Sequence, residues 1–88
     1  MEIRFSPKAE NDIEYWKKSG NTVAMSKITI LLKDIAKHPF TGIGKPEPLK
    51  YDFAGCWSRH IYSEHRIVYE ILENDIYILT LRYHYSKK

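Results

Sequence analysis

The chain has 88 residues, 43% of them hydrophobic and 14% aromatic, so we expect one small domain spanning residues 1–88 around a single core. Its one cysteine, Cys56, excludes an intramolecular disulfide and a multi-cysteine metal site. No apolar run approaches the roughly 20 residues that span a bilayer, so we expect a cytoplasmic protein that does not enter the membrane. The net charge of +3 permits a polyanionic partner but favours one only weakly.

The first half of the chain has the pattern of one strand followed by two helices. Apolar and charged residues alternate over residues 1–5, which predicts a strand with one exposed face. Ser6-Pro7 is typical of a helix N-terminus, and apolar residues recur at helical spacing from there to Ser19-Gly20. Asn21 can cap a second helix, which must end before Pro39. We expect these helices to form a hairpin.

The second half has the pattern of a loop followed by a sheet. Residues 39–48 hold three of the four prolines and two of the four glycines, which indicates a shaped loop. Its Gly42-Ile43-Gly44-Lys45 segment lacks the spacing of a phosphate-binding P-loop, so we interpret it as a turn. We then expect strands at 49–51, 56–62, 65–72 and 76–85. The predicted fold is α+β, with element order β-α-α-β-β-β-β and the helical hairpin packed on a mixed or antiparallel sheet.

Strand alternation predicts which side chains share a face of this sheet. A two-residue turn in the first hairpin sets Ile61 opposite Arg66 and puts Arg59 on the same side as Arg66. A three-residue turn at 73–75 sets Arg66 opposite Arg82 and adds His84 to that side. Positive charges this close repel one another unless an anion lies among them, so the pattern predicts an anion-binding face.

Several separated motifs stand in order along the chain. They are Pro39-Phe40 with Gly42-x-Gly44-Lys45-Pro46-Glu47-Pro48-Leu49-Lys50, then Gly55-x-Trp57-Ser58-Arg59, then Glu64-His65-Arg66-x-Val68-Tyr69, and finally Arg82-Tyr83-His84-Tyr85. Together they resemble the YoeB toxins of the RelE superfamily, over nearly the whole chain and most strongly from Pro39 onward. The resemblance implies a microbial-ribonuclease-like fold and an endoribonuclease that cleaves mRNA on the ribosome and inhibits translation. It also implies neutralisation by a YefM-type antitoxin in a type II toxin–antitoxin system, while a homodimer is left open.

The resemblance further implies roles for single residues. Glu47 is expected to be the general base, His84 the general acid and Arg66 the phosphate clamp, with Lys50 as further positive charge and Tyr85 orienting the RNA. Such a set can cleave RNA without a metal, because a base activates the ribose 2′-hydroxyl, a cation steadies the phosphorane and an acid protonates the leaving oxygen. Guanidinium donors match phosphate oxygens in pairs, and histidine titrates nearest neutrality. No metal or cofactor is expected.

Three further residues complete the set expected to bind or orient RNA. Arg59 and Arg82 belong to the predicted anion-binding face. His60 stands where family members often carry a second arginine, so a phosphate contact there would depend on pH.

Structural interpretations and other functions compete with this one. Glu47 between two prolines is also typical of a solvated loop carboxylate, Arg66 can pair with Glu64 or Glu70, and His84 can be a partly buried sheet residue. A ParE-type toxin acting on DNA gyrase would share the architecture without the ribonuclease residues. A non-catalytic module that binds ribosomal RNA would keep its effect when Glu47, Arg66 or His84 is substituted.

Overall fold

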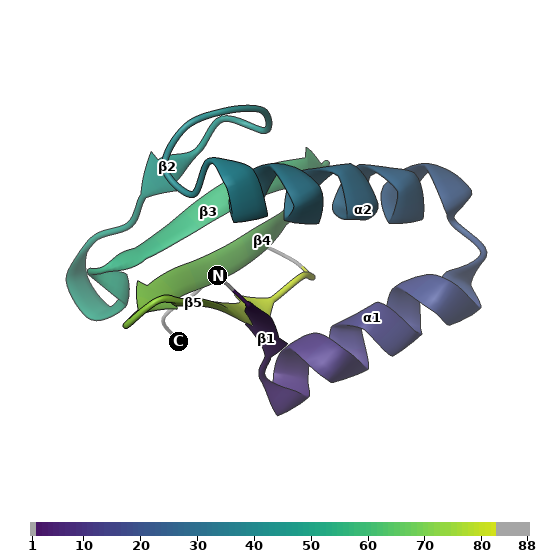
Figure 1. The fold of residues 1–88 in the computed structure, drawn as a ribbon. Helices are drawn as coiled ribbons and strands as arrows, with labels where there is room; N and C mark the ends of the chain where they lie inside the picture. Colours follow the sequence, from purple (N-terminus) through teal and green to yellow (C-terminus); the bar gives the residue numbers. More distant parts are fainter. Residues whose placement is uncertain (1, 83–88) are drawn as a thin grey trace.

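The computed structural model describes residues 2–82, which form two helices and a five-stranded sheet (Figure 1). The sheet has the order β1-β5-β4-β3-β2, with β1 parallel to β5 and the other neighbours antiparallel. The predicted α+β class and element order are confirmed. In chain order the elements are β1 (Ile3–Phe5), α1 (Pro7–Ser19), α2 (Thr22–Lys37), β2 (Glu47–Pro48), the 3-10 turn η1 (Tyr51–Phe53), β3 (Cys56–Tyr62), β4 (His65–Leu72) and β5 (Asp75–Thr80).

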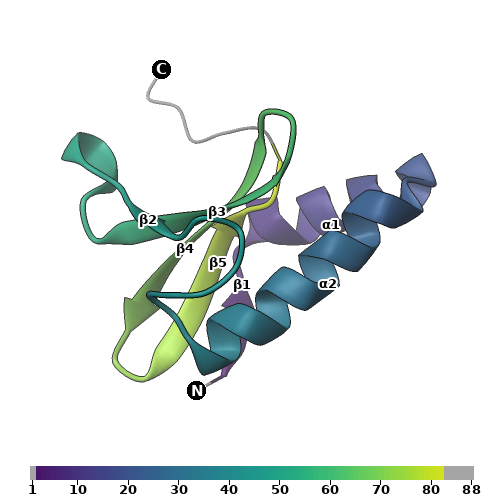
Figure 2. The same ribbon diagram turned by 90° about the horizontal axis from the view of Figure 1, so that it is seen from above.

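Both helices begin where the sequence predicts. The Ser6 hydroxyl accepts a hydrogen bond from the backbone N–H of Ala9, and the Asn21 side-chain oxygen accepts one from Ala24, both at 3.0 Å. Gly20 ends α1 in the left-handed conformation, with φ of 74°. The helices lie on the same side of the sheet (Figures 1 and 2). Neither of these helices, the ones in the described part of the chain, is long and apolar enough to cross a membrane.

The two faces of the sheet differ in what they bury. The face toward the helices, the helix face, forms the main core with the apolar sides of α1 and α2. Strand alternation turns Val68, between Ile67 and Tyr69 of that core, to the opposite side, the far face. There it forms a smaller cluster with Leu49 and Cys56. The fully buried residues of the main core include Ala9, Leu31, Ile35, Ile67, Tyr69, Ile76, Ile78 and Leu81.

The predicted bounds of two strands are wrong. The strand expected at residues 49–51 is instead β2 at Glu47–Pro48, and the chain then turns, with Tyr51 at φ 58° and Phe53 N–H bonded to the Lys50 carbonyl. The last strand stops at Thr80, because α1 takes up the backbone groups of Leu81 that a strand would pair. The remainder of the predicted strand, from residue 83, lies outside the described residues.

Bulges change the predicted registers. Tyr62 pairs with His65 as predicted, but the ladder shifts at Ile61, so Arg66 lies opposite His60 and the predicted partner Ile61 is wrong. In the next hairpin Leu72 pairs with Asp75, so the predicted three-residue turn is also wrong. A second irregularity, between the pairs Tyr69–Ile78 and Val68–Thr80, moves the ladder by one residue. From Val68 on, the register is therefore the one that the three-residue turn predicted.

Candidate functional site

The far face brings together three of the residues expected to act on RNA. Glu47 on β2 pairs with Ser58 on β3, and directly opposite residues project from the same face of a sheet. Ser58 in turn pairs with Val68 of the far-face cluster. His60, two residues along β3, lies opposite Arg66 on β4. Glu47, His60 and Arg66 therefore share the far face, with β3 between the carboxylate and the guanidinium.

A hollow of about 230 Å³ borders the Glu47 side of this face. Lys50 is exposed on its wall, so a carboxylate and an ammonium group border the same space. Tyr51, also on the wall, is 84% exposed, and an exposed ring is suited to stacking on an unpaired base. Tyr51 was not among the residues singled out from the sequence, because residues 49–51 were predicted to be a strand. The hollow is lined by Glu47, Pro48, Leu49, Lys50 and Tyr51.

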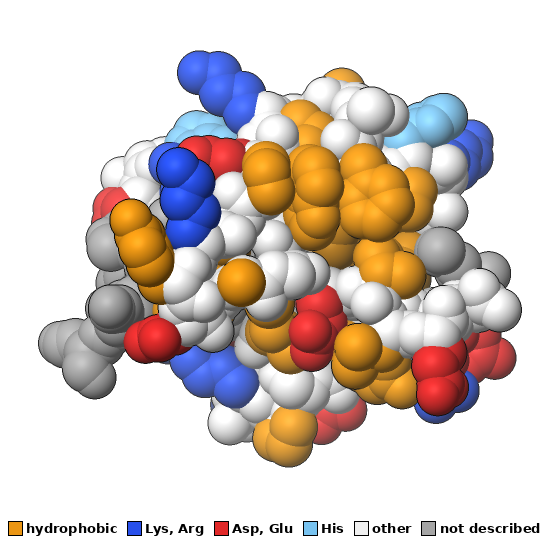
Figure 3. Space-filling model, turned by 90° about the vertical axis from the view of Figure 1, so that its left-hand side faces the viewer, with side chains coloured by type: hydrophobic (Ala, Val, Ile, Leu, Met, Phe, Trp, Pro, Cys, Tyr) orange, Lys and Arg blue, Asp and Glu red, His pale blue; other side chains and the backbone are white. Residues whose placement is uncertain are grey.

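The surface around β2 is not uniformly basic. On the side shown in Figure 3, Lys and Arg side chains alternate with Asp and Glu around a group of hydrophobic side chains. Positive charge on this side is therefore local, as the small net charge of +3 suggests.

Arg59 does not lie with Arg66, which contradicts the predicted shared face. The shift at Ile61 sets Arg59 opposite Ile67, on the helix face, where its side chain has no exposed surface. Its Nε donates to the hydroxyl of Tyr69, and its terminal nitrogens donate to a carboxylate and three carbonyls. All five donors of the guanidinium are thereby used, and none is available for an RNA phosphate. The oxygens that accept from the terminal nitrogens are Asp34 Oδ2 (2.7 Å) and the carbonyls of His38, Thr41 and Ile43.

This buried arginine holds the loop that leads into β2. Two of its partners also bind the loop: the Tyr69 hydroxyl donates to the Pro39 carbonyl at 2.7 Å, and the Asp34 carboxylate accepts from Ile43 N–H at 3.2 Å. The hydrogen bond from Arg59 holds the pKa of Asp34 below its ordinary value, and burial raises the pKa of Tyr69. A Cβ at Gly42, where φ is 120°, would collide with the Asp34 carboxylate. The loop conformation, and hence the start of β2, is set by these contacts.

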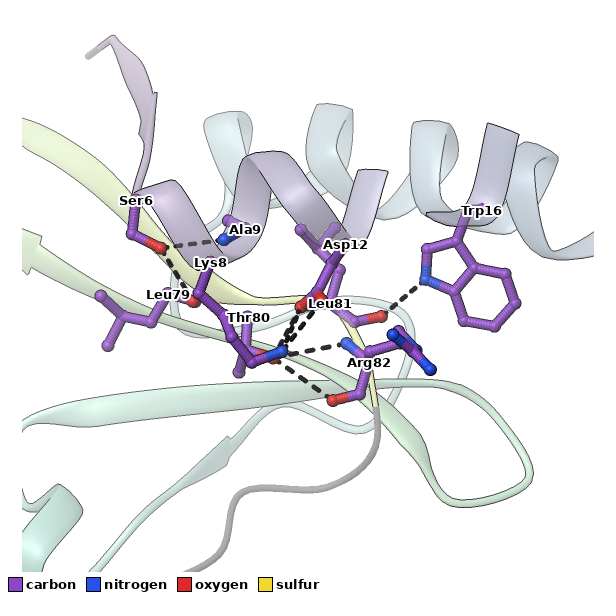
Figure 4. Close-up of polar contacts among 9 residues, drawn as sticks. All are labelled: Ser6, Lys8, Ala9, Asp12, Trp16, Leu79, Thr80, Leu81 and Arg82. Carbon is purple, nitrogen blue, oxygen red and sulfur yellow. Dashed lines mark hydrogen bonds and ion pairs between the residues drawn. The ribbon is translucent and has the colours of Figure 1, made fainter. Parts of the chain in front are cut away.

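A buried carboxylate, that of Asp12, fixes the end of β5 against α1 (Figure 4). It accepts hydrogen bonds from Leu81 N–H at 2.9 Å, from the Thr80 hydroxyl at 3.0 Å and from Lys8 Nζ at 2.9 Å. Trp16 Nε1 donates to the Leu81 carbonyl at 2.9 Å. The sequence holds the signal for this role, because Asp12 lies three residues after Ala9 and four before Trp16, on the apolar side of the helix.

The C-terminal motif is described only at its first residue. The guanidinium of Arg82 lies over the ring of Tyr15 on α1, 3.6 Å from its centroid, a cation–π contact. Because β5 ends at Thr80, the predicted pairing of Arg66 with Arg82 falls beyond the last strand pair. His84 and Tyr85 lie outside the described residues, so their roles remain predictions.

Two histidines and the cysteine make contacts within the fold. His65 is 9% exposed and packs edge-on against Trp16, with centroids 4.9 Å apart. His60 Nε2 lies 3.0 Å from the Ser63 carbonyl oxygen. Cys56 is buried in the far-face cluster, and burial raises the pKa of its thiol, so little thiolate forms at neutral pH. Within residues 2–82, no three His, Cys, Asp or Glu side chains gather in a way that could hold a metal ion.

Comparison with known proteins places this chain in a family. A family model for the YoeB-like toxin of a bacterial type II toxin–antitoxin system matches residues 5–85. Toxin YoeB of Synechocystis sp. is 44% identical over 87 residues, which cover 99% of this chain and all of that protein. The chain therefore belongs to the YoeB family of toxins.

Solved structures of similar proteins agree with this assignment. The YoeB/ParE toxin from Agrobacterium tumefaciens is 37% identical, with a TM-score of 0.91 over 97% of this chain and all of that one. Two Staphylococcus aureus structures are each 42% identical over 97% of this chain and 98% of theirs. One is a heterotetrameric YoeB–YefM toxin–antitoxin complex, with a TM-score of 0.84, and the other is a YoeB dimer, with a TM-score of 0.85.

Proposed function

We propose that this toxin is a cytoplasmic endoribonuclease that cleaves mRNA on the ribosome and so inhibits translation. The observation that carries the proposal is the register of β2, β3 and β4, which sets Glu47 and Arg66 on one face with a single strand between them. A base and a phosphate-binding cation at that separation can act on neighbouring atoms of one nucleotide. Membership of the YoeB family supports the same activity.

The reaction needs three groups acting in concert. Glu47 takes the proton of the ribose 2′-hydroxyl, and the 2′-oxygen forms a bond to phosphorus. Arg66 donates paired hydrogen bonds to the phosphate oxygens, which carry more charge in the phosphorane than in the substrate. His84 gives a proton to the 5′-oxygen as the P–O5′ bond breaks, which leaves a 2′,3′-cyclic phosphate and a 5′-hydroxyl. The role of His84 rests on the resemblance alone.

Neighbouring residues bind and orient the RNA in this proposal. Lys50 attracts phosphate beside the hollow, and His60, opposite Arg66, adds a contact that strengthens when its ring is protonated. Tyr51 stacks on a base, while Arg82 and Tyr85 act from the C-terminal motif. Arg59 is not part of this set, because its guanidinium is buried and fully bonded.

The test is to add the purified protein to programmed ribosomes and map the 3′ ends of the mRNA. Glu47→Gln should lower the single-turnover cleavage rate about 10² to 10⁴-fold, the usual effect of losing a general base, and should leave ribosome binding intact. Glu70→Gln is the matched control, because Glu70 also lies on the far face, opposite Cys56. This variant should cleave mRNA at the normal rate. Absence of cleavage by the wild-type protein, or equal rates in all three, would contradict the proposal.

Growth and gyrase measurements beside this assay separate the competing functions. A toxin whose Glu47→Gln variant still arrests growth without cutting mRNA acts by binding ribosomal RNA. Inhibition of purified DNA gyrase, with no effect on ribosomes, would indicate ParE-type action.

We further propose that a YefM-type antitoxin is the physiological partner and that the toxin can form a homodimer. The Staphylococcus aureus relatives, solved as a YoeB–YefM complex and as a YoeB dimer, support both assemblies.

A further inference from the structure

Ser58 presents a buried hydroxyl that the proposed reaction does not use. The residue has no exposed surface, and its Oγ has no hydrogen-bond partner within the described part of the chain. A buried hydroxyl without a partner destabilises a fold, because it loses its bonds to water and gains none in return. A buried group of this kind therefore calls for an explanation other than folding stability.

Among residues 2–82, the strand neighbours of Ser58 leave Glu47 as the polar side chain available to bond its hydroxyl. Cys56 precedes it by two residues on the same face, and Val68 faces it on β4, both in the apolar far-face cluster. His60, two residues further on, directs its Nε2 to the Ser63 carbonyl. On the β2 side the directly opposite residue is Glu47, at a spacing that brings cross-strand side chains into contact.

We propose that Ser58 is a positioning residue that donates its hydroxyl proton to a hydrogen bond with the Glu47 carboxylate when RNA occupies the far face. The inference rests on the proposed function. The Glu47 side chain is exposed, so water satisfies its carboxylate in the free protein. Bound RNA excludes that water, and the carboxylate then turns toward the nearest free donor. The hydrogen bond fixes one oxygen and directs the other at the ribose 2′-hydroxyl.

In Ser58→Ala we expect a lower cleavage rate without a loss of stability. Ser58→Ala deletes a hydroxyl that has no hydrogen-bond partner among the described residues, so the denaturant midpoint should stay the same or rise. The same change should lower kcat about 10- to 100-fold, the rate equivalent of a hydrogen bond to a charged group. KM for programmed ribosomes should stay within about twofold, since the hydroxyl does not touch the RNA. A residue that served folding alone would lower the midpoint instead.

The nearly isosteric pair Ser58→Thr and Ser58→Val isolates the hydroxyl from any change in packing. Thr should restore kcat relative to Ala, whereas Val should not. The acidic limb of the kcat–pH profile should move to higher pH in the Ala and Val variants, because the ionised base loses a donor. Among the described residues, the other charged or titratable groups near this face are Lys45 and Lys50 beside β2, Cys56 and His60 on β3, and Arg66 and Glu70 on β4. All are the same in the four proteins.

The comparison is made with the full chain on programmed ribosomes, with Cys56→Ala as the control for a changed side chain on the same strand and face. The expected result is a lower kcat in Ala and Val, recovery in Thr, normal kcat in Cys56→Ala and an unchanged or higher midpoint in Ser58→Ala. Equal kcat in Thr and Val, or an unchanged pH profile in Ala, would overturn the inference while leaving the ribonuclease proposal standing. A wild-type protein that does not cleave would overturn both.

Discussion

Two arginines seven positions apart have opposite surroundings in this protein. Arg66 lies on the far face opposite His60, whereas Arg59 is enclosed by α2, the loop after it and Tyr69. Both lie in strands of similar composition, and the pairing register of β3 with β4 sets them on opposite faces of the sheet. Their substitutions should therefore affect different properties.

Arg66→Lys should lower the cleavage rate and leave folding unchanged. One ammonium group retains the charge but not the paired donors that fit two phosphate oxygens, so we expect a loss of about 10-fold or more. Single-turnover cleavage measures the rate, and urea unfolding measures stability. The control is Arg4→Lys, because Arg4 lies on β1, the sheet edge remote from β2, and forms a surface ion pair with Asp75. Full activity of Arg66→Lys would show that charge alone suffices.

Arg59→Met should destabilise the fold. Removal of a fully buried guanidinium leaves Asp34 and three loop carbonyls without their donor, and breaking such a buried pair costs about 3–5 kcal/mol. The free energy of unfolding in urea measures this loss. Arg4→Met, which removes an exposed ion pair, should cost far less, because exposed ion pairs contribute little to stability. Similar costs for the two variants would contradict a central role for Arg59.

At the scale of the elements, the helices followed from local signals, whereas the sheet ladders depended on irregularities. Ser6, Pro7 and Gly20 act within one helical turn, so their effect is visible in the sequence. The bulge at Ile61 has no such marker. It is favoured by contacts across the fold, since it lets both Ile61 and Tyr62 meet the helix side, where Tyr62 packs on Trp16.

The candidate site was predictable to the same extent. Glu47 and Arg66 were singled out from short motifs, and the structure sets them on one face through a register that differs by one residue from the predicted one. Arg59 was misplaced by that single residue, because a shift of one reverses the face of every later side chain. Asp34 and Tyr69, which bind the loop before β2, are distant from it in sequence, and only tertiary structure brings them together.

The loop before β2 should loosen in acid through Asp34. The hydrogen bond from Arg59 lowers the pKa of this carboxyl in the folded protein below its ordinary value of 3.8. Its contribution to stability is then complete above the unfolded pKa and is lost as pH falls below 3.8 through the lower, folded value. Urea unfolding measured from pH 6 to pH 2 should show a decline that is smaller in Asp34→Asn. An identical decline in both proteins would exclude Asp34 as its source.

For the whole molecule, the proposed partner should compete with RNA. In the proposed reaction Lys50, His60 and Arg66 bind phosphate, so carboxylates of an antitoxin segment can occupy the same positions. We expect that segment to be acidic, to bear aromatic residues and to be disordered when free, which exposes it to proteolysis. Addition of a YefM-type antitoxin should abolish cleavage and protect amides of β3 and β4 from hydrogen exchange. Protection confined to α1 and α2, with cleavage retained, would contradict this mode of inhibition.

The parallel pairing of β1 with β5 sets a limit on when this protein can become active during its own synthesis. Ile3 is made before its partner Ile76, which follows 73 residues later, and Ser6 N–H also waits for the Ile78 carbonyl. The nascent chain can form α1 and α2 early. However, β4 lacks a strand partner on one side until β5 has left the exit tunnel. Contacts between such distant segments form slowly. The time before folding is complete is then available for the proposed antitoxin to bind.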